Sequence, residues 1–125
     1  MTEHTFHVNP MGAVRMNKSD AWKKRPAVLR YRAFKDALRL QAPPLRKDPM
    51  IVNLEFHIPM PASWSEKKKA AMFGGFHRTK PDVDNIFKAC TDTLWPDNDS
   101  LIAKTTASKF WAYKGRILME VIYDE

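Results

Sequence analysis

The chain has 125 residues, of which 44% are apolar, and a net charge of +7; this length and composition exclude a multi-domain protein and a disordered one. No apolar run approaches the roughly 18 residues of a membrane-spanning helix, and a single cysteine, Cys90, excludes an internal disulfide framework. The first residues lack a basic segment followed by an apolar stretch, so we expect no signal peptide and a cytoplasmic protein.

The first half of the chain predicts two strands and one helix. A weak alternation of apolar and polar residues over 4–8 predicts a first strand. Proline suits the first helical turn, so we expect a helix from Pro26 to the break at 41–44. The clearest strand covers 51–58, where every second residue is apolar. The apolar face expected for the helix consists of Ala27, Tyr31, Phe34 and Leu38.

The second half predicts two helices followed by two strands. A capping box at Ser63 and Glu66 starts a short basic helix, and we expect residues 60–80 to form a mobile loop around it. A second helix starts near Asp82 and buries Cys90, and strands follow near 101–111 and 116–123. The order of elements indicates one small α+β domain over residues 1–125, with helices packed on a mixed β-sheet.

Charge is distributed unevenly along the chain. Residues 1–81 contain 16 basic and 6 acidic residues, whereas residues 82–125 contain 5 basic and 8 acidic ones. The basic excess favours a polyanionic partner, usually a nucleic acid. Arg32, Lys35 and Arg39 form one stripe of the first helix, which is either a DNA contact or a solvated face. The expected DNA-binding residues are Arg15, Lys18, Lys23, Lys24, Arg25, Arg32, Lys35, Arg78 and Lys80.

Five aspartates fall within the 18 positions from Asp82 to Asp99. Hydrolysis of a phosphodiester with divalent ions needs converging carboxylates, and Mg²⁺ prefers oxygen ligands. Asp82 and Asp84 lie two residues apart at a helix start, and Asp97 or Asp99 on the later turn could complete the cluster. Lys88, one turn beyond Asp84, could contact the scissile phosphate.

Each of these residues has a simpler structural alternative. Asp82 could serve only as a helix N-cap, and Asp84 could form only a surface ion pair with Lys88. Residues 97–99 could owe their acids to turn formation. An EF-hand is disfavoured, because the loop lacks its glycine and Ser108 stands where the bidentate glutamate belongs.

Two separated motifs resemble the RusA family of Holliday junction resolvases. Residues 80–89 carry an Asp-x-Asp-Asn-x-x-Lys pattern at the helix start, and residues 95–102 carry the later acidic turn. Residues 14–26 and 60–65 also resemble the phage and prophage branch of this family. One position departs from the pattern, because Asn98 stands where the family usually has the first of two acids.

The resemblance implies an intertwined homodimer that binds four-way DNA junctions and resolves them by paired, symmetric nicks in recombination and repair. It implies a Mg²⁺-dependent crossover junction endodeoxyribonuclease, with Mn²⁺ as a substitute, in a bacterial cell and of phage or prophage origin. By motif, Asp82, Asp84 and Asp99 hold the metal and Lys88 assists, while a place for Asp97 as an outer ligand stays open. The alternative is a non-catalytic basic protein that binds branched or bent DNA, but such a protein has no use for acids that repel phosphate.

Overall fold

The structure, a computed structural model, describes residues 1–15 and 25–124. The elements are β1 (Thr2–Phe6), α1 (Pro26–Gln41), β2 (Pro49–Pro59), α2 (Glu66–Met72), α3 (Val83–Leu94), the 3₁₀ turn η2 (Asp99–Leu101), β3 (Lys104–Ala112) and β4 (Arg116–Tyr123). The strands form one sheet in the order β1-β4-β2-β3. β2 pairs in parallel with β3, and the other two pairings are antiparallel. The predicted α+β class and mixed sheet are confirmed.

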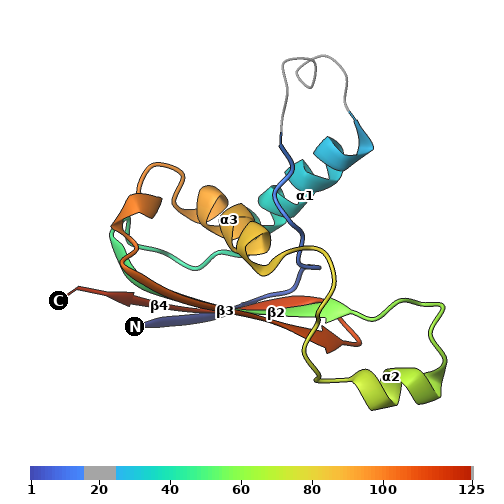
Figure 1. The fold of residues 1–125 in the computed structure, drawn as a ribbon. Coiled ribbons are helices and arrows are strands. Elements are labelled where there is room, and N and C mark those ends of the chain that lie inside the picture. The colour runs from blue at the N-terminus through green and yellow to red at the C-terminus, as the bar shows by residue number, and fades with distance from the viewer. Residues whose placement is uncertain (16–24, 125) are drawn as a thin grey trace.

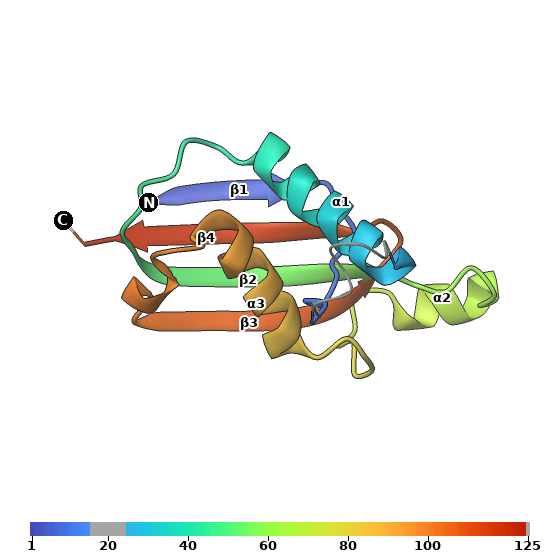
Figure 2. The same cartoon turned by 90° about the horizontal axis from the view of Figure 1, so that it is seen from above.

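Helices α1 and α3 lie side by side on one face of the sheet (Figures 1 and 2). The strict alternation in β2 explains this arrangement, because successive side chains point to opposite faces. Val52, Leu54 and Phe56 point toward the helices and are buried, whereas Asn53 and Glu55 point to the other face. On β4, the residues that complete the core are Ile117, Met119, Val121 and Tyr123.

Helix α1 begins at Pro26, as predicted, but its buried residues are Val28, Tyr31, Phe34 and Leu38. The predicted Ala27 lies on the same side of the helix but is only partly buried, and Val28, which was not predicted, is buried beside this face. The apolar face packs on the chain's own sheet and is therefore not a surface for a partner.

Helix α3 packs its apolar side on the same core. Cys90 is 2% exposed, and burial raises the pKa of its thiol to about 12. This confirms Cys90 as a small core residue. Two buried threonines satisfy their hydroxyls locally: Thr91 Oγ1 donates to the Phe87 carbonyl and Thr93 Oγ1 to the Ala89 carbonyl, at 3.2 and 2.7 Å.

Helix α2 projects beyond the end of the sheet (Figures 1 and 2). Its N-cap is Ser65, whose side chain accepts a hydrogen bond from Lys68 N at 3.1 Å. The predicted cap at Ser63 is wrong, because Trp64 N donates to the Pro61 carbonyl and closes a turn there. Within the described residues no helix has the length and apolar character needed to cross a membrane.

The connection from α2 to α3 is bonded to the end of β3. Gly74 N donates to the Trp111 carbonyl at 3.0 Å, Trp111 N to Gly75 at 2.9 Å, and His77 N to Lys109 at 2.9 Å. These bonds hold the backbone of residues 74–77 as a short antiparallel addition to the sheet. The expected mobility of residues 60–80 stays a prediction.

Strand β1 starts and ends two residues earlier than the predicted 4–8. His7 leaves the sheet because its backbone pairs with the side chain of Gln41 at the end of α1. His7 N donates to Gln41 Oε1 at 2.6 Å, and Gln41 Nε2 donates to the His7 carbonyl at 3.1 Å. β3 likewise starts at Lys104 and not at Leu101, because η2 occupies residues 99–101.

Candidate active site

The first turn of α3 presents two exposed carboxylates. Asp82 is the N-cap residue, and its backbone carbonyl accepts hydrogen bonds from Asn85 N and Ile86 N at 3.1 Å each. Its carboxylate, however, caps no N–H group among the described residues. Asp82 therefore occupies the N-cap position, as the alternative role predicted, but its carboxylate does not form the capping hydrogen bond that this role requires. The positive end of the helix dipole favours both Asp82 and Asp84 at this position.

Lys109 on β3 fixes the backbone that leads into this turn. Its Nζ donates to the carbonyls of Thr79 and Pro81 at 2.6 and 2.7 Å. The Lys80–Pro81 peptide bond between these carbonyls is cis. Because Pro81 directly precedes Asp82, these two hydrogen bonds from Lys109 fix the position of the backbone at which α3 starts.

The buried side chain of His77 contacts the same segment. It is 5% exposed and its ring lies 4.2 Å from that of Trp111. Thr79 Oγ1 lies 3.4 Å from His77 Nε2. Burial, and then the charge of Lys109, lowers the pKa of His77 below its ordinary value of 6.5. The imidazole of His77 is therefore neutral and buried, and it packs against the loop whose Thr79 and Pro81 carbonyls accept hydrogen bonds from Lys109.

Asn85 ties the start of α3 to the segment before residue 16. Asn85 Nδ2 donates to the Ala13 carbonyl at 3.2 Å, and Ala13 N donates to the Asn85 carbonyl at 3.3 Å. The side chain of Asn85 approaches the backbone of Gly12 so closely that an added Cβ would lie 2.6 Å from Asn85 Nδ2. Glycine at this position therefore permits the contact that brings Arg15 toward α3.

Arg15, Lys35 and Lys88 line one hollow between α1, α3 and residues 13–15, together with Asp92. The sequence predicted the first two as DNA contacts and Lys88 as a catalytic residue, and the structure brings all three together. Lys35 Nζ lies 5.1 Å from the centre of the Tyr31 ring. Three cations around one hollow create a local positive potential suited to phosphate.

Among the described residues, Lys88 pairs with Asp92 and not with Asp84. Lys88 Nζ lies 3.1 Å from Asp92 Oδ2, so the predicted alternative of an Asp84–Lys88 pair is wrong. The hydrogen bond and charge of Asp92 raise the pKa of Lys88, and the charge of Asp99 adds to the effect. Lys88 is therefore cationic at neutral pH and lies within the electrostatic influence of Asp99.

Asp82 and Asp84 lie at the start of α3, whereas Asp97 and Asp99 follow its C-terminal end in the chain. Over residues 1–15 and 25–124, no three His, Cys, Asp or Glu side chains lie close enough together to hold a metal ion. The single chain thus places the predicted acids in two groups.

The predicted DNA-binding residues fall into two described regions. Arg15, Arg32 and Lys35 lie at α1 and the segment packed against α3, while Arg78 and Lys80 are exposed just before Asp82. Arg25 is also described, and its Nη2 donates to the Arg15 carbonyl at 3.2 Å. The remaining three, Lys18, Lys23 and Lys24, lie outside the described residues. Within the helix stripe, Arg39 pairs with Asp36 at 3.3 Å.

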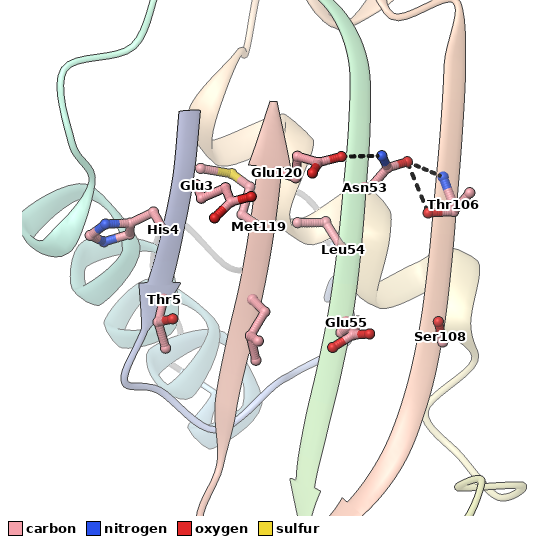
Figure 3. A pocket seen from close by; sticks show the side chains of 11 residues that line it. Glu3, His4, Thr5, Asn53, Leu54, Glu55, Thr106, Ser108, Met119 and Glu120 are labelled. Atoms are coloured by element: carbon pink, nitrogen blue, oxygen red, sulfur yellow. Dashed lines mark hydrogen bonds between the residues drawn. The ribbon is translucent and has the colours of Figure 1, made fainter. Parts of the chain in front are cut away.

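The opposite face of the sheet has an acidic character. A hollow there is lined by Glu3, Glu55 and Glu120 (Figure 3). Asn53 donates from Nδ2 to Glu120 at 2.9 Å and accepts from Thr106 Oγ1 at 2.8 Å. Carboxylates repel phosphate, so the part of this face around Glu3, Glu55 and Glu120 does not suit a polyanion.

Sequence reasoning missed Lys109 and Asn85 as residues that hold the site together. A signal for Lys109 exists, because it shares the inward-facing alternation of β3 with Ala107 and Trp111. A lysine in such a register needs a polar partner beneath the helices. For Asn85 the signal is its place within the Asp-x-Asp-Asn pattern, next to the candidate acids.

A protein-family model matches most of the chain. The family model described as "Endodeoxyribonuclease RusA" matches residues 7–122. No curated protein and no solved structure matches the chain.

Proposed function

The chain belongs to the RusA endodeoxyribonuclease family, and on this premise we propose that it is a Mg²⁺-dependent enzyme that resolves Holliday junctions by paired nicks. The observation that carries the proposal is the first turn of α3. It presents the Asp82 and Asp84 carboxylates in an otherwise basic region, on a backbone that Lys109 fixes. A protein that only binds DNA gains nothing from two exposed acids beside its cations.

The donor set fits a hard divalent cation. Mg²⁺ takes oxygen ligands, keeps several waters and is often held by only one or two carboxylates, which Asp82 and Asp84 supply. When bound, such an ion activates a water and offsets charge on the phosphate. The chain's own part is to hold the two carboxylates at a fixed spacing, and the carbonyl bonds of Lys109 provide the rigidity.

The cations beside α3 would bind the DNA backbone. Arg15, Lys35 and Lys88 line one hollow next to Asn85, one residue from Asp84. Lys88 is held by Asp92 at 3.1 Å, so its ammonium is oriented before a phosphate arrives. Pre-oriented charge stabilises the negative charge that develops on the phosphate oxygens during cleavage.

Asp99 remains the proposed third metal ligand on the strength of the family's motif, with Asp97 nearby as a candidate outer ligand. Because no three acids among the described residues lie close enough together to hold a metal ion, one chain assembles a three-carboxylate site only if the turn at 95–101 moves. A second copy of the chain could instead supply its own Asp99. We propose a homodimer, which provides that copy and also provides two active sites for the two strands of one junction.

Cleavage of synthetic DNA tests this proposal. We expect the protein to nick a four-way junction in Mg²⁺, to leave a linear duplex of the same sequence intact, and to be inactive in EDTA. Asp84→Asn should abolish cleavage while junction binding persists or tightens, because a charge that repels phosphate is lost. Asp124→Asn, the same chemical change at an exposed site near the end of β4, is the matched control. Near wild-type cleavage by Asp84→Asn would show that the metal-site assignment is wrong.

A further inference from the structure

Phe76 is a large apolar side chain held in solvent beside the candidate site. It is 68% exposed, yet its backbone is fixed. Phe76 forms an antiparallel bridge with Phe110, and the next residue, His77, donates to the Lys109 carbonyl at 2.9 Å. Its exposure therefore results from a defined backbone position and not from a loose chain end.

The Phe76 ring ends a row of aromatic rings along the sheet. It stacks on Phe110 at 5.4 Å between centroids, with 23° between the ring planes. Phe110 in turn lies 5.6 Å from the ring of His57. Offset stacking of this kind is favourable for planar rings, and the exposed end of the row is open to a further planar group.

Phe76 also lines a hollow at the edge of β3 with Arg78, Val83, Ala107 and Ser108; we call it the Phe76 hollow. Its volume is about 360 Å³, within the roughly 300–1,000 Å³ of small-ligand sites. Val83 stands between Asp82 and Asp84 in the chain, so the hollow adjoins the two candidate metal ligands. Its lining also includes His77 and Lys109, so three apolar side chains share it with a hydroxyl, an imidazole and two cations.

We propose that the Phe76 hollow binds one unpaired base of the branched DNA substrate, stacked on Phe76, while Arg78 contacts the adjacent phosphate. This inference rests on the proposed function for its substrate. Aromatic rings flanked by cations are the general means by which proteins hold unpaired bases, because every base has a stacking face and every nucleotide carries a phosphate. A branch point interrupts base stacking and so lowers the cost of unpairing a base beside it.

The charge of the hollow argues against self-association at this surface. A two-fold contact buries the same patch on both copies, so it would bring the Arg78 cation of each copy into one interface. Exposed Lys80 follows two residues later and adds to the repulsion. Both cations favour the polyanionic substrate instead.

A junction with 2-aminopurine at its branch point tests the proposal, in EDTA so that binding is separated from cleavage. Stacking on Phe76 should change the fluorescence of this base when the wild-type protein binds. Phe76→Ala should remove the change and weaken junction binding roughly 5- to 150-fold, the range that follows from stacking on one base. Phe76→Trp should retain both. Phe73→Ala is the matched control, because Phe73 is 56% exposed but its ring lies 5.1 Å from that of Tyr113 and does not line the hollow.

Three results would overturn the proposal. One is a Phe76→Ala protein that matches Phe73→Ala in affinity and fluorescence. Another is a fluorescence change lost equally in both variants. The third is a Phe76→Ala protein that sediments as a monomer where Phe73→Ala sediments as a dimer, which would make the hollow a self-association surface. If Phe76→Ala does not fold, Phe76→Leu against Phe76→Trp gives the same comparison. A wild-type protein that shows the fluorescence change but never cleaves in Mg²⁺ contradicts the proposed function and leaves the base-binding hollow supported.

Discussion

Replacing Lys109 by methionine removes a charge while keeping most of the side chain's length and apolar bulk. The lost contacts are the two hydrogen bonds from Nζ to the carbonyls of Thr79 and Pro81, at 2.6 and 2.7 Å. A hydrogen bond from a charged group contributes about 1.5–3 kcal/mol when buried. The Pro81 bond is partly buried and the Thr79 bond is exposed, so we take the low end of that range for the pair.

We therefore expect Lys109→Met to lower the free energy of unfolding by about 2 kcal/mol. For a chain of this size that corresponds to a fall in Tm of roughly 8 °C. The cleavage rate should fall by more than the loss of stability alone would cause, because the loosened segment carries Asp82 and Asp84. A small displacement of catalytic groups is enough to reduce a rate about 100-fold.

The assay combines thermal unfolding with a Mg²⁺ titration of junction cleavage at saturating DNA. Lys104→Met, an exposed lysine on the same strand, is the control and should change stability by less than about 0.5 kcal/mol. Lys109→Arg should retain part of the activity, since a guanidinium also donates to carbonyls. The reasoning is refuted if Lys109→Met has the Tm and cleavage rate of Lys104→Met.

Three further outcomes follow from individual side chains. Lys88→Ala should lose most of its cleavage activity but should bind Mn²⁺ as the wild type does in isothermal titration, because the proposed partner of Lys88 is the phosphate. A large loss of metal affinity would contradict that role. Lys114→Ala, which changes an exposed lysine, is the control. The lowered pKa of His77 means that the unfolded chain takes up a proton below pH 6.5 that the folded chain does not. Stability should thus fall as the pH drops from 6.5 toward 5, and it should fall less in His77→Phe by urea unfolding. Cys90 should react with a thiol reagent only when the protein unfolds, since burial raises its pKa to about 12; rapid labelling of the native protein would contradict the buried assignment.

The elements with strong periodicity were predictable from the sequence. β2, α1 and α3 follow from alternation or helical spacing, because each buries one continuous face. Their ends were less predictable where a distant side chain decides them. The Gln41 side chain ends β1 because it forms hydrogen bonds with the backbone of His7, 34 residues away. The local pattern of apolar and polar residues carries no signal of such a contact. The strand order also depends on the parallel pairing of β2 with β3, which is non-local.

The candidate site was predictable in its residue types and not in its geometry. Asp82, Asp84 and Lys88 stand out by their spacing at a helix start. The sequence could not show that Lys88 would pair with Asp92, since Asp84 lies at the same spacing on the other side. Nor could it place Asp99 relative to Asp82, because the turn that follows α3 decides where η2 lies. The role of Lys109 required the register of β3 against β2.

The central claim is that two metal-dependent active sites cut one junction together. A supercoiled plasmid that extrudes a cruciform tests it directly, because paired nicks across the junction within one binding event give linear DNA, whereas single nicks give open circles. We predict linear product in Mg²⁺ from the wild-type protein, no product in EDTA, and no product from Asp84→Asn. Open circles alone, or linear product that persists in Asp84→Asn, would contradict the account.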